Sequence, residues 1–139
     1  MSALDAVCVV LVEPQDPVNI AGVVRAMKNM GVQQLRLVTP VECDASRVER
    51  VAHDTRDIVA QIRTFESLDD AIADCVYTAG FTARRRAAKW SLSTPREIAP
   101  PLLAAAADGP VALFFGREDH GLSNEALARA RTVVTIPTT

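Results

Sequence analysis

Glycine, cysteine and aromatic residues are all scarce in this sequence of 139 residues. There are 6 glycines, 8 prolines and 3 cysteines, and aromatic residues make up 4% of the chain. The low glycine and proline content excludes a collagen-like or low-complexity chain. The cysteines are far apart and form no C-x-x-C pair, which excludes the usual zinc knuckles and favours reduced thiols. We therefore expect no metal site and a core of valine, isoleucine, leucine and alanine.

Long hydrophobic runs are also absent. No segment approaches the roughly 18 apolar residues that a membrane-spanning helix needs. The apolar run Ala6–Val12 is cut short by Glu13 and Pro14, and no lysine or arginine precedes it, so it does not resemble a signal peptide. The formal net charge of −2 excludes an overall basic surface but allows a local basic patch. We expect a cytoplasmic protein without a membrane partner.

Five short apolar runs, rich in valine, recur along the chain. They do not alternate with polar residues, which is typical of parallel strands buried on both faces. Segments with helical spacing separate them, and no linker or repeat divides the chain. The sequence therefore predicts one α/β domain over residues 1–139, with a mainly parallel sheet flanked by helices. The predicted strands are Val7–Val12, Leu35–Val38, Val76–Gly80, Val111–Phe115 and Val133–Ile136, with a weaker candidate near Ile62–Phe65.

Capping residues and prolines mark the boundaries of the predicted helices. Asn19 is predicted to cap the first helix, and Gly31 is predicted to end it. Thr94 begins a capping-box pattern, but Pro100 and Pro101 limit that helix to about one turn unless a second helix starts at Pro101. The remaining predicted helices are Ser46–Ala60, Leu68–Asp74 and Asn124–Ala130, the last capped by Ser123.

The common phosphate and nucleotide signatures are absent, so function must be sought in other segments. There is no G-x-G-x-x-G, P-loop, H-E-x-x-H or G-x-S-x-G. Directly after the first predicted strand, Asn19 offers an amide, Gly22 offers room and Arg25 offers a guanidinium suited to phosphate. Ligands of open α/β sheets bind beyond the carboxyl ends of the strands. The alternative is a capped helix with one surface arginine.

Two further segments follow predicted strands. In F-F-G-R-E-D-H-G-L-S-N-E, two glycines enclose a charged loop that holds Glu118 at a strand end. In A-G-F-T-A-R-R-R-A-A-K-W, Arg84, Arg85, Arg86 and Lys89 concentrate positive charge near Phe81 and Trp90, a mixture that suits a nucleic-acid backbone and an unstacked base. Both segments can also be read as ordinary solvated loops.

Together these segments resemble the SpoU/TrmH family of the SPOUT methyltransferases, with the greatest likeness to its TrmJ-type tRNA 2′-O-ribose methyltransferases. The likeness covers essentially the whole chain in order, although Phe81 replaces a small polar residue of the family pattern. The matching strings are N-I-A-G-V-V-R-A-M-K-N-M-G from Asn19, F-G-R-E-D-H-G-L-S-N-E from Phe115, A-G-F-T-A-R-R-R from Ala79 and T-P-R-E from Thr94.

The resemblance implies a SPOUT-like, Rossmann-like fold and transfer of a methyl group from S-adenosyl-L-methionine to a ribose 2′-hydroxyl of RNA, most simply tRNA. It implies catalytic roles for Arg25, Asn19 and Glu118. A guanidinium is a poor base, so we expect Arg25 to hold a phosphate and stabilise charge on the reacting oxygen. The cofactor-binding residues are expected to be Ala79, Gly80, Phe81, Gly116 and Ile136, and the RNA-binding residues Arg84, Arg85, Arg86 and Lys89.

The family pattern continues beyond an Ile-Pro strand end through a Ser-Leu-Asn segment into a final helix, whereas this sequence stops at Thr139. The resemblance therefore implies a truncated C-terminal trefoil knot, with part of the cofactor pocket and of the homodimer contact missing. We expect a homodimer for the complete protein, and weak or no cofactor binding by the 139-residue chain alone. The alternative function is a non-catalytic α/β module, derived from the same fold, that binds RNA or dimerises.

Overall fold

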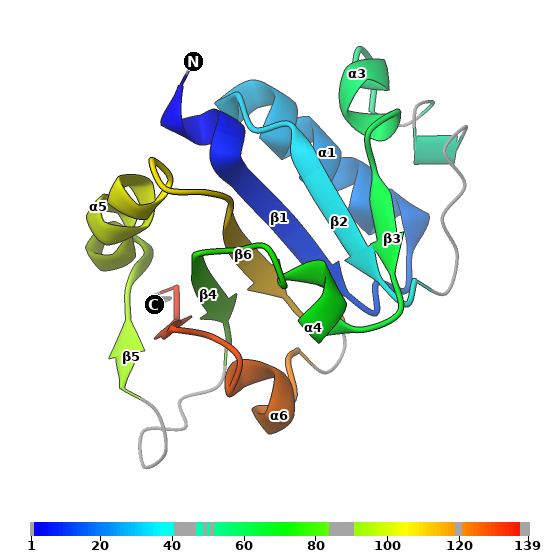
Figure 1. The fold of residues 1–139 in the computed structure, drawn as a ribbon. Helices are drawn as coiled ribbons and strands as arrows, with labels where there is room; N and C mark the ends of the chain where they lie inside the picture. The colour runs from blue at the N-terminus through cyan, green and yellow to red at the C-terminus, as the bar shows by residue number, and fades with distance from the viewer. Residues whose placement is uncertain are drawn as a thin grey trace.

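A computed structural model describes residues 2–40, 47–48, 50, 52–83, 91–118 and 121–136. It forms one seven-stranded sheet with helices on both faces (Figure 1). The strands are β1 (Val7–Val12), β2 (Gln34–Val38), β3 (Arg63–Phe65), β4 (Tyr77–Phe81), β5 (Leu92–Ser93), β6 (Val111–Phe115) and β7 (Thr132–Val134). The helices are the 3-10 helix η1 (Ala3–Ala6), α1 (Pro17–Met30), α3 (Arg56–Val59), α4 (Leu68–Ala71), α5 (Pro95–Ala105) and α6 (Asn124–Leu127).

The strand order is β3-β2-β1-β6-β4-β7-β5, and all of these neighbours pair in parallel. The predicted parallel α/β sheet is therefore confirmed. The chain leaves β1 toward β2 on one side and leaves β6 toward β7 on the other. The connections thus diverge at the carboxyl ends of β1 and β6, which is where open α/β sheets bind ligands.

The two faces of the sheet are covered by different helices because side chains alternate along each strand. Val9 and Leu11 of β1 pack with buried residues of α1 and α3, whereas Val10 packs with Leu127 of α6 on the opposite face. Helix α5 covers the same face as α1, over β4 and β7. Figure 1 accordingly shows α4 and α6 in front of the sheet and α1 behind it.

Helix α1 begins three residues earlier than predicted. Its N-cap is Asp16, whose side chain accepts a hydrogen bond of 2.9 Å from the backbone N–H of Val18. Pro17 occupies the first turn, where its fixed φ favours the helix and its missing N–H costs nothing. The prediction of Asn19 as the N-cap is therefore wrong, since Asn19 lies inside the first turn. The predicted end at Gly31 is confirmed, with a left-handed φ of 78°.

Helix α5 runs through two prolines that were predicted to limit it. The capping box at Thr94 is present, with Glu97 as its partner, but the helix then continues to Ala105. Pro100 and Pro101 are exposed, so water can reach the backbone carbonyls that lose an intrahelical partner. Meanwhile Ile98 and Leu102 are buried against the sheet. We infer that this packing outweighs the two missing hydrogen bonds.

The other short helices also differ from the prediction. The predicted helix Ser46–Ala60 is interrupted, because Asp54 has a positive φ of 61° and only Arg56–Val59 forms α3 after it. Helices α4 and α6 are each one turn long and end earlier than predicted. The weak strand candidate is confirmed as β3, whereas β5 was not predicted because two residues carry no periodic pattern.

Candidate functional site

Asn19 and Glu118 face the same groove at the carboxyl edge of the sheet. We call it the α1 groove; its volume is about 500 Å³. It lies at the divergence point between β1 and β6. Its apolar walls include Val9 and Leu11 of β1, Leu113 and Phe115 of β6, and Val23 and Met27 of α1. The two predicted motifs, separated by almost a hundred residues of sequence, thus meet at one site.

A hydrogen bond joins the two motifs directly. The backbone N–H of Gln15 donates to the Glu118 carboxylate, at 3.2 Å from one oxygen and 3.4 Å from the other. The Gln15 side chain in turn donates to the Glu13 carbonyl at 2.7 Å. Glu118 therefore fixes the loop that leads into α1. The sequence did not point to Gln15, because the donor is its backbone N–H, which almost every residue type could supply.

Arg25 lies on the exposed side of α1 and is not among the residues that line the α1 groove. It follows Asn19 by six residues, which is about 9 Å along a helix axis. Within the described parts of the chain, Arg25 has no hydrogen-bond or ion-pair partner. The structure thus brings Asn19 and Glu118 together and leaves the guanidinium nearby with all of its donors available.

The glycine between them, Gly22, faces open space. A Cβ atom built at Gly22 would meet no atom within 4 Å, so no neighbouring backbone in the described structure requires a glycine there. A helix-interior glycine costs up to about 1 kcal/mol relative to alanine. The described residues therefore give no packing reason for a glycine at this position.

Gly116, by contrast, is required by the fold of its own loop. A Cβ atom at Gly116 would lie 2.1 Å from the carbonyl carbon of Gly121 and 2.3 Å from the nitrogen of Leu122. The loop closes on itself through a hydrogen bond of 2.8 Å from the Gly121 N–H to the Arg117 carbonyl. This closure presents Glu118 toward Gln15. The predicted constrained loop is confirmed for the described residues 116–118 and 121.

The predicted cofactor-binding residues lie at or near one edge of the sheet. Ala79 and Gly80 are buried within β4, and the space beside Gly80 is filled by the Phe114 ring. Phe81 ends β4 and stacks on Phe115, with ring centroids 4.4 Å apart. Ile136 follows β7 and is 59% exposed. Phe81 and Ile136 thus offer apolar surface at the carboxyl ends of two adjacent strands, whereas Ala79 and Gly80 are packed inside the sheet.

The predicted RNA-binding residues Arg84, Arg85, Arg86 and Lys89 lie outside the described residues. The strand that leads to them, β4, ends at the same edge of the sheet as β1 and β6. Within the described ranges, no helix is both long and apolar enough to cross a membrane.

Comparison with known proteins identifies the family. The family model described as the SpoU rRNA Methylase family matches residues 6–139. The tRNA (cytidine/uridine/adenosine-2′-O-)-methyltransferase TrmJ of Pseudomonas aeruginosa (strain UCBPP-PA14) is 43% identical over 96% of this chain and 52% of its own length. The tRNA (cytidine/uridine-2′-O-)-methyltransferase TrmJ of Escherichia coli (strain K12) is 38% identical over 96% of this chain and 54% of its own length.

A solved structure agrees with these relatives. The crystal structure of TrmJ from Z. mobilis ZM4 superimposes with a TM-score of 0.84 at 32% identity, covering 95% of this chain and 58% of that one. This α/β chain belongs to the SpoU rRNA methylase family. It spans about half the length of the curated relatives it matches.

Proposed function

We propose that this chain carries the site of an RNA ribose 2′-O-methyltransferase that uses S-adenosyl-L-methionine and acts on tRNA in the cytoplasm. The observation that carries the proposal is the meeting of Asn19 and Glu118 at one groove, at the point where the sheet connections diverge. Membership of the SpoU family and the names of the TrmJ relatives support the choice of reaction and substrate.

In this proposal Arg25 receives the RNA. Its exposed guanidinium can bind a backbone phosphate in a bidentate manner and can stabilise negative charge that develops on the ribose 2′-oxygen. The open space at Gly22, one turn before Arg25, allows a sugar to approach the helix backbone. Asn19 presents an amide from the same helix to orient the ribose hydroxyl.

Glu118 acts as a positioning residue. Its carboxylate already accepts hydrogen bonds from the Gln15 N–H, so it holds the loop that places α1 and therefore Asn19 and Arg25. A carboxylate that is engaged with the backbone can maintain the geometry of the reacting groups. This favours loop-holding over a direct contact with Arg25 as the role of Glu118.

The residues at the carboxyl ends of β4, β6 and β7 suit the cofactor. Phe81 and Ile136 supply partly exposed apolar surface for a planar ring, and Gly116 adds backbone groups at the end of β6. Ala79 and Gly80 support this edge from within β4. When bound, S-adenosyl-L-methionine supplies a methyl group on a sulfonium, which is a good leaving group. The contribution of the chain is then to align the hydroxyl and stabilise its charge.

The direct experiment is to incubate the purified full-length protein with tRNA and S-adenosyl-L-methionine labelled in its methyl group. We expect label in 2′-O-methylnucleosides after digestion, identified by mass spectrometry. The matched control is the same tRNA carrying a 2′-deoxyribose at the modified position, which should accept no label. Label on a base, or no label on any tRNA, would contradict the proposal.

The basic segment is proposed to bind RNA phosphates. Removing one arginine that binds a phosphate should reduce the slope of log affinity against log salt by about 0.7 to 0.9. We expect the double substitution Arg84→Ala/Arg85→Ala to weaken tRNA binding and to flatten that slope. The matched control is Arg56→Ala, an exposed arginine on α3. An unchanged slope in the double variant would show that the segment does not contact RNA.

The α1 groove supports the alternative function, a non-catalytic module in which a second copy of the chain, rather than RNA, covers this groove. Its walls are mainly apolar, and the adjacent Met30 side chain is 69% exposed. Exposed apolar surface of this kind marks interaction sites. Light scattering should therefore give a dimer mass for the wild type and a monomer mass for Met30→Glu. A wild-type monomer at micromolar concentration would contradict a dimer of this chain.

A further inference from the structure

A second pocket lies at the carboxyl edge of the sheet, on the face opposite the α1 groove. We call it the Glu13 pocket; its volume is about 340 Å³. The residues that line it include Val12, Glu13, Arg117, Leu122, Ser123 and Ala126. The apolar ones pack with the buried cluster on the face of the sheet that α6 covers. The methyl transfer proposed above gives no role to any of these side chains.

Two short loops separate the Glu13 pocket from the α1 groove. After β1, Glu13 lines the pocket and the next residue, Pro14, lines the groove. After β6, Arg117 lines the pocket, whereas its neighbours Gly116 and Glu118 line the groove. An RNA strand that binds at the α1 groove therefore has the Glu13 pocket directly beside it.

The backbone of Glu13 is held in a conformation that favours glycine. Its φ is 54°, in the left-handed region that costs energy for a residue with a Cβ atom. The Glu13 N–H donates to the Val38 carbonyl at 2.8 Å, and the Glu13 carbonyl accepts from the Gln15 side chain at 2.7 Å. A glycine could make both hydrogen bonds without strain. The presence of a glutamate instead points to a use for its side chain.

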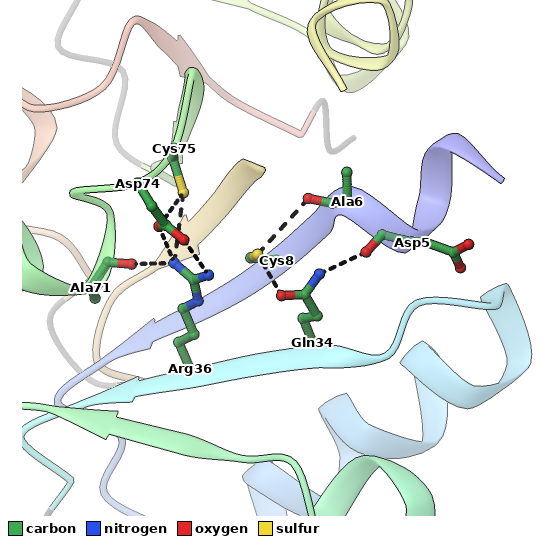
Figure 2. A network of polar contacts seen from close by, with 8 residues as sticks. All are labelled: Asp5, Ala6, Cys8, Gln34, Arg36, Ala71, Asp74 and Cys75. Atoms are coloured by element: carbon green, nitrogen blue, oxygen red, sulfur yellow. Dashed lines mark hydrogen bonds and ion pairs between the residues drawn. The ribbon is translucent and has the colours of Figure 1, made fainter. Parts of the chain in front are cut away.

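The fold does not use the Glu13 carboxylate. Among the residues that the structure describes, only the backbone groups of Glu13 find hydrogen-bond partners. The network around Arg36 shows the opposite case (Figure 2). There the guanidinium donates to the Ala71 carbonyl at 2.7 Å and to the two Asp74 carboxylate oxygens at 2.6 and 3.0 Å. The Glu13 carboxylate, by contrast, keeps its acceptor capacity for a ligand.

The pocket offers a hydrogen-bond acceptor and a donor beside apolar surface. An ionised carboxylate only accepts, so Glu13 requires an N–H or O–H group from its ligand. The Ser123 hydroxyl accepts from the Ala126 N–H at 3.0 Å and keeps its own proton to donate. A nucleobase has apolar faces, and its Watson–Crick edge carries an N–H donor next to an acceptor. The chemistry of the pocket therefore matches a nucleobase.

We propose that the Glu13 pocket binds an unstacked base of the substrate RNA, and that the Glu13 carboxylate accepts the Watson–Crick N–H of this base. The inference rests on the proposed function, because it takes RNA as the ligand. Ser123 donates to the neighbouring acceptor of the base, and the apolar lining covers a face of the ring. Because base pairing occupies the same edge, the pocket selects a single-stranded segment of the RNA.

The experiment measures whether the N–H of the base and the Glu13 carboxylate act together. Fluorescence anisotropy gives the affinity of the full-length protein for a short oligouridylate and for the same oligonucleotide methylated at N3 of each base. This methylation removes the only N–H of uracil. We expect it to weaken binding to the wild type by about 10-fold or more, the effect of losing a hydrogen bond to a charged group. In Glu13→Ala the same methylation should have little effect.

Three controls isolate this interaction. Methylation of the base at C5 leaves the N–H in place and should not change binding to either protein. Glu66→Ala removes an exposed glutamate that lines neither the pocket nor the groove, so it should respond to N3 methylation as the wild type does. Glu13→Gly adopts the positive φ without strain. Its melting temperature should therefore stay close to that of the wild type, while its affinity becomes insensitive to N3 methylation.

An equal loss of affinity on N3 methylation in the wild type and in Glu13→Ala would overturn the inference. A wild type that binds neither oligonucleotide would overturn it as well. The proposed function is judged separately, by transfer of the methyl group to tRNA. A wild type whose affinity depends on the N–H, but which transfers no methyl group, would support the Glu13 pocket and contradict the methyltransferase.

Discussion

Arg25 and Arg36 show two opposite uses of the same side chain. Arg36 is buried on β2 and donates hydrogen bonds to the Ala71 carbonyl and the Asp74 carboxylate. Arg25 is exposed on α1 and has no partner within the described residues. A buried cation must be paired because its desolvation is costly, so Arg36 stabilises a connection between elements. An exposed and unpaired cation keeps its capacity for a ligand, which is the role we propose for Arg25.

The largest effect is expected on catalysis from Arg25→Ala. Loss of one charge-stabilising group should reduce tRNA methylation by about 10²- to 10³-fold. The melting temperature should change little, because Arg25 has no hydrogen-bond or ion-pair partner within the described residues. The matched control is Lys28→Ala on the same helix, whose ion pair of 3.1 Å with Asp57 is half exposed. Methylation by Arg25→Ala within a few-fold of the wild type would remove Arg25 from the site.

The next effect is expected on stability from Arg36→Ala. Removing the buried guanidinium leaves the Ala71 carbonyl without its hydrogen-bond donor and should lower the free energy of unfolding by about 1 to 3 kcal/mol. Urea denaturation measures this change. Arg63→Ala on the neighbouring strand is the matched control, since its guanidinium lies over the Phe65 ring at 4.9 Å and is exposed. That contact is worth about 0.5 to 1 kcal/mol. Equal losses of unfolding free energy in Arg36→Ala and Arg63→Ala would contradict the expected difference between a buried and an exposed arginine.

Two glycines extend the comparison to the backbone. Gly116→Ala should destabilise the protein by about 2 kcal/mol or more, because the new Cβ would overlap the backbone of Gly121. Gly22→Ala should raise the free energy of unfolding by about 0.5 to 1 kcal/mol, since nothing lies near the added methyl. Thermal unfolding distinguishes the two signs. If the open space at Gly22 receives RNA, tRNA methylation should fall in this stabilised variant.

The smallest effect concerns pH. The hydrogen bond from Arg36 holds the pKa of Asp74 below its ordinary value of 3.8, while burial opposes this shift. Because the folded pKa is the lower one, the Asp74 contribution is present above about pH 4 and is lost as the pH falls through the folded pKa. The Asp74 side chain is 51% exposed, so we expect less than about 1 kcal/mol. Between about pH 5 and pH 2, wild-type stability should fall more steeply than that of Asp74→Asn.

Much of the fold was predictable because its signals are local. Buried parallel strands have apolar sequences on both faces, so the runs at β1 and β6 were recognisable without any alignment. Gly31 and the Thr94 capping box also act within one helical turn. The N-cap of α1 was misplaced because Asp16 and Asn19 are both good caps, and only the proline between them decides the start.

The rest depends on contacts between distant segments. The continuation of α5 past Pro100 follows from burial against the sheet, which no local pattern shows. The bond between the Gln15 N–H and Glu118 joins two loops whose only common property is their place at the sheet edge. The contact of 3.8 Å between the Arg36 guanidinium and the Cys75 sulfur likewise joins β2 to the segment that follows α4.

The position of β6 also constrains how the chain assembles during synthesis. β6 lies in the middle of the sheet between β1 and β4, yet it is the sixth of the seven strands to leave the ribosome. A nascent chain that ends before Val111 can pair β3, β2 and β1, whereas β4 and β5 have no strand partner because β6 and β7 are still missing. Insertion of β6 joins β4 to β1 and also delivers Glu118 to Gln15. Attachment of β4 to the sheet and completion of the candidate site are thus one late, long-range event.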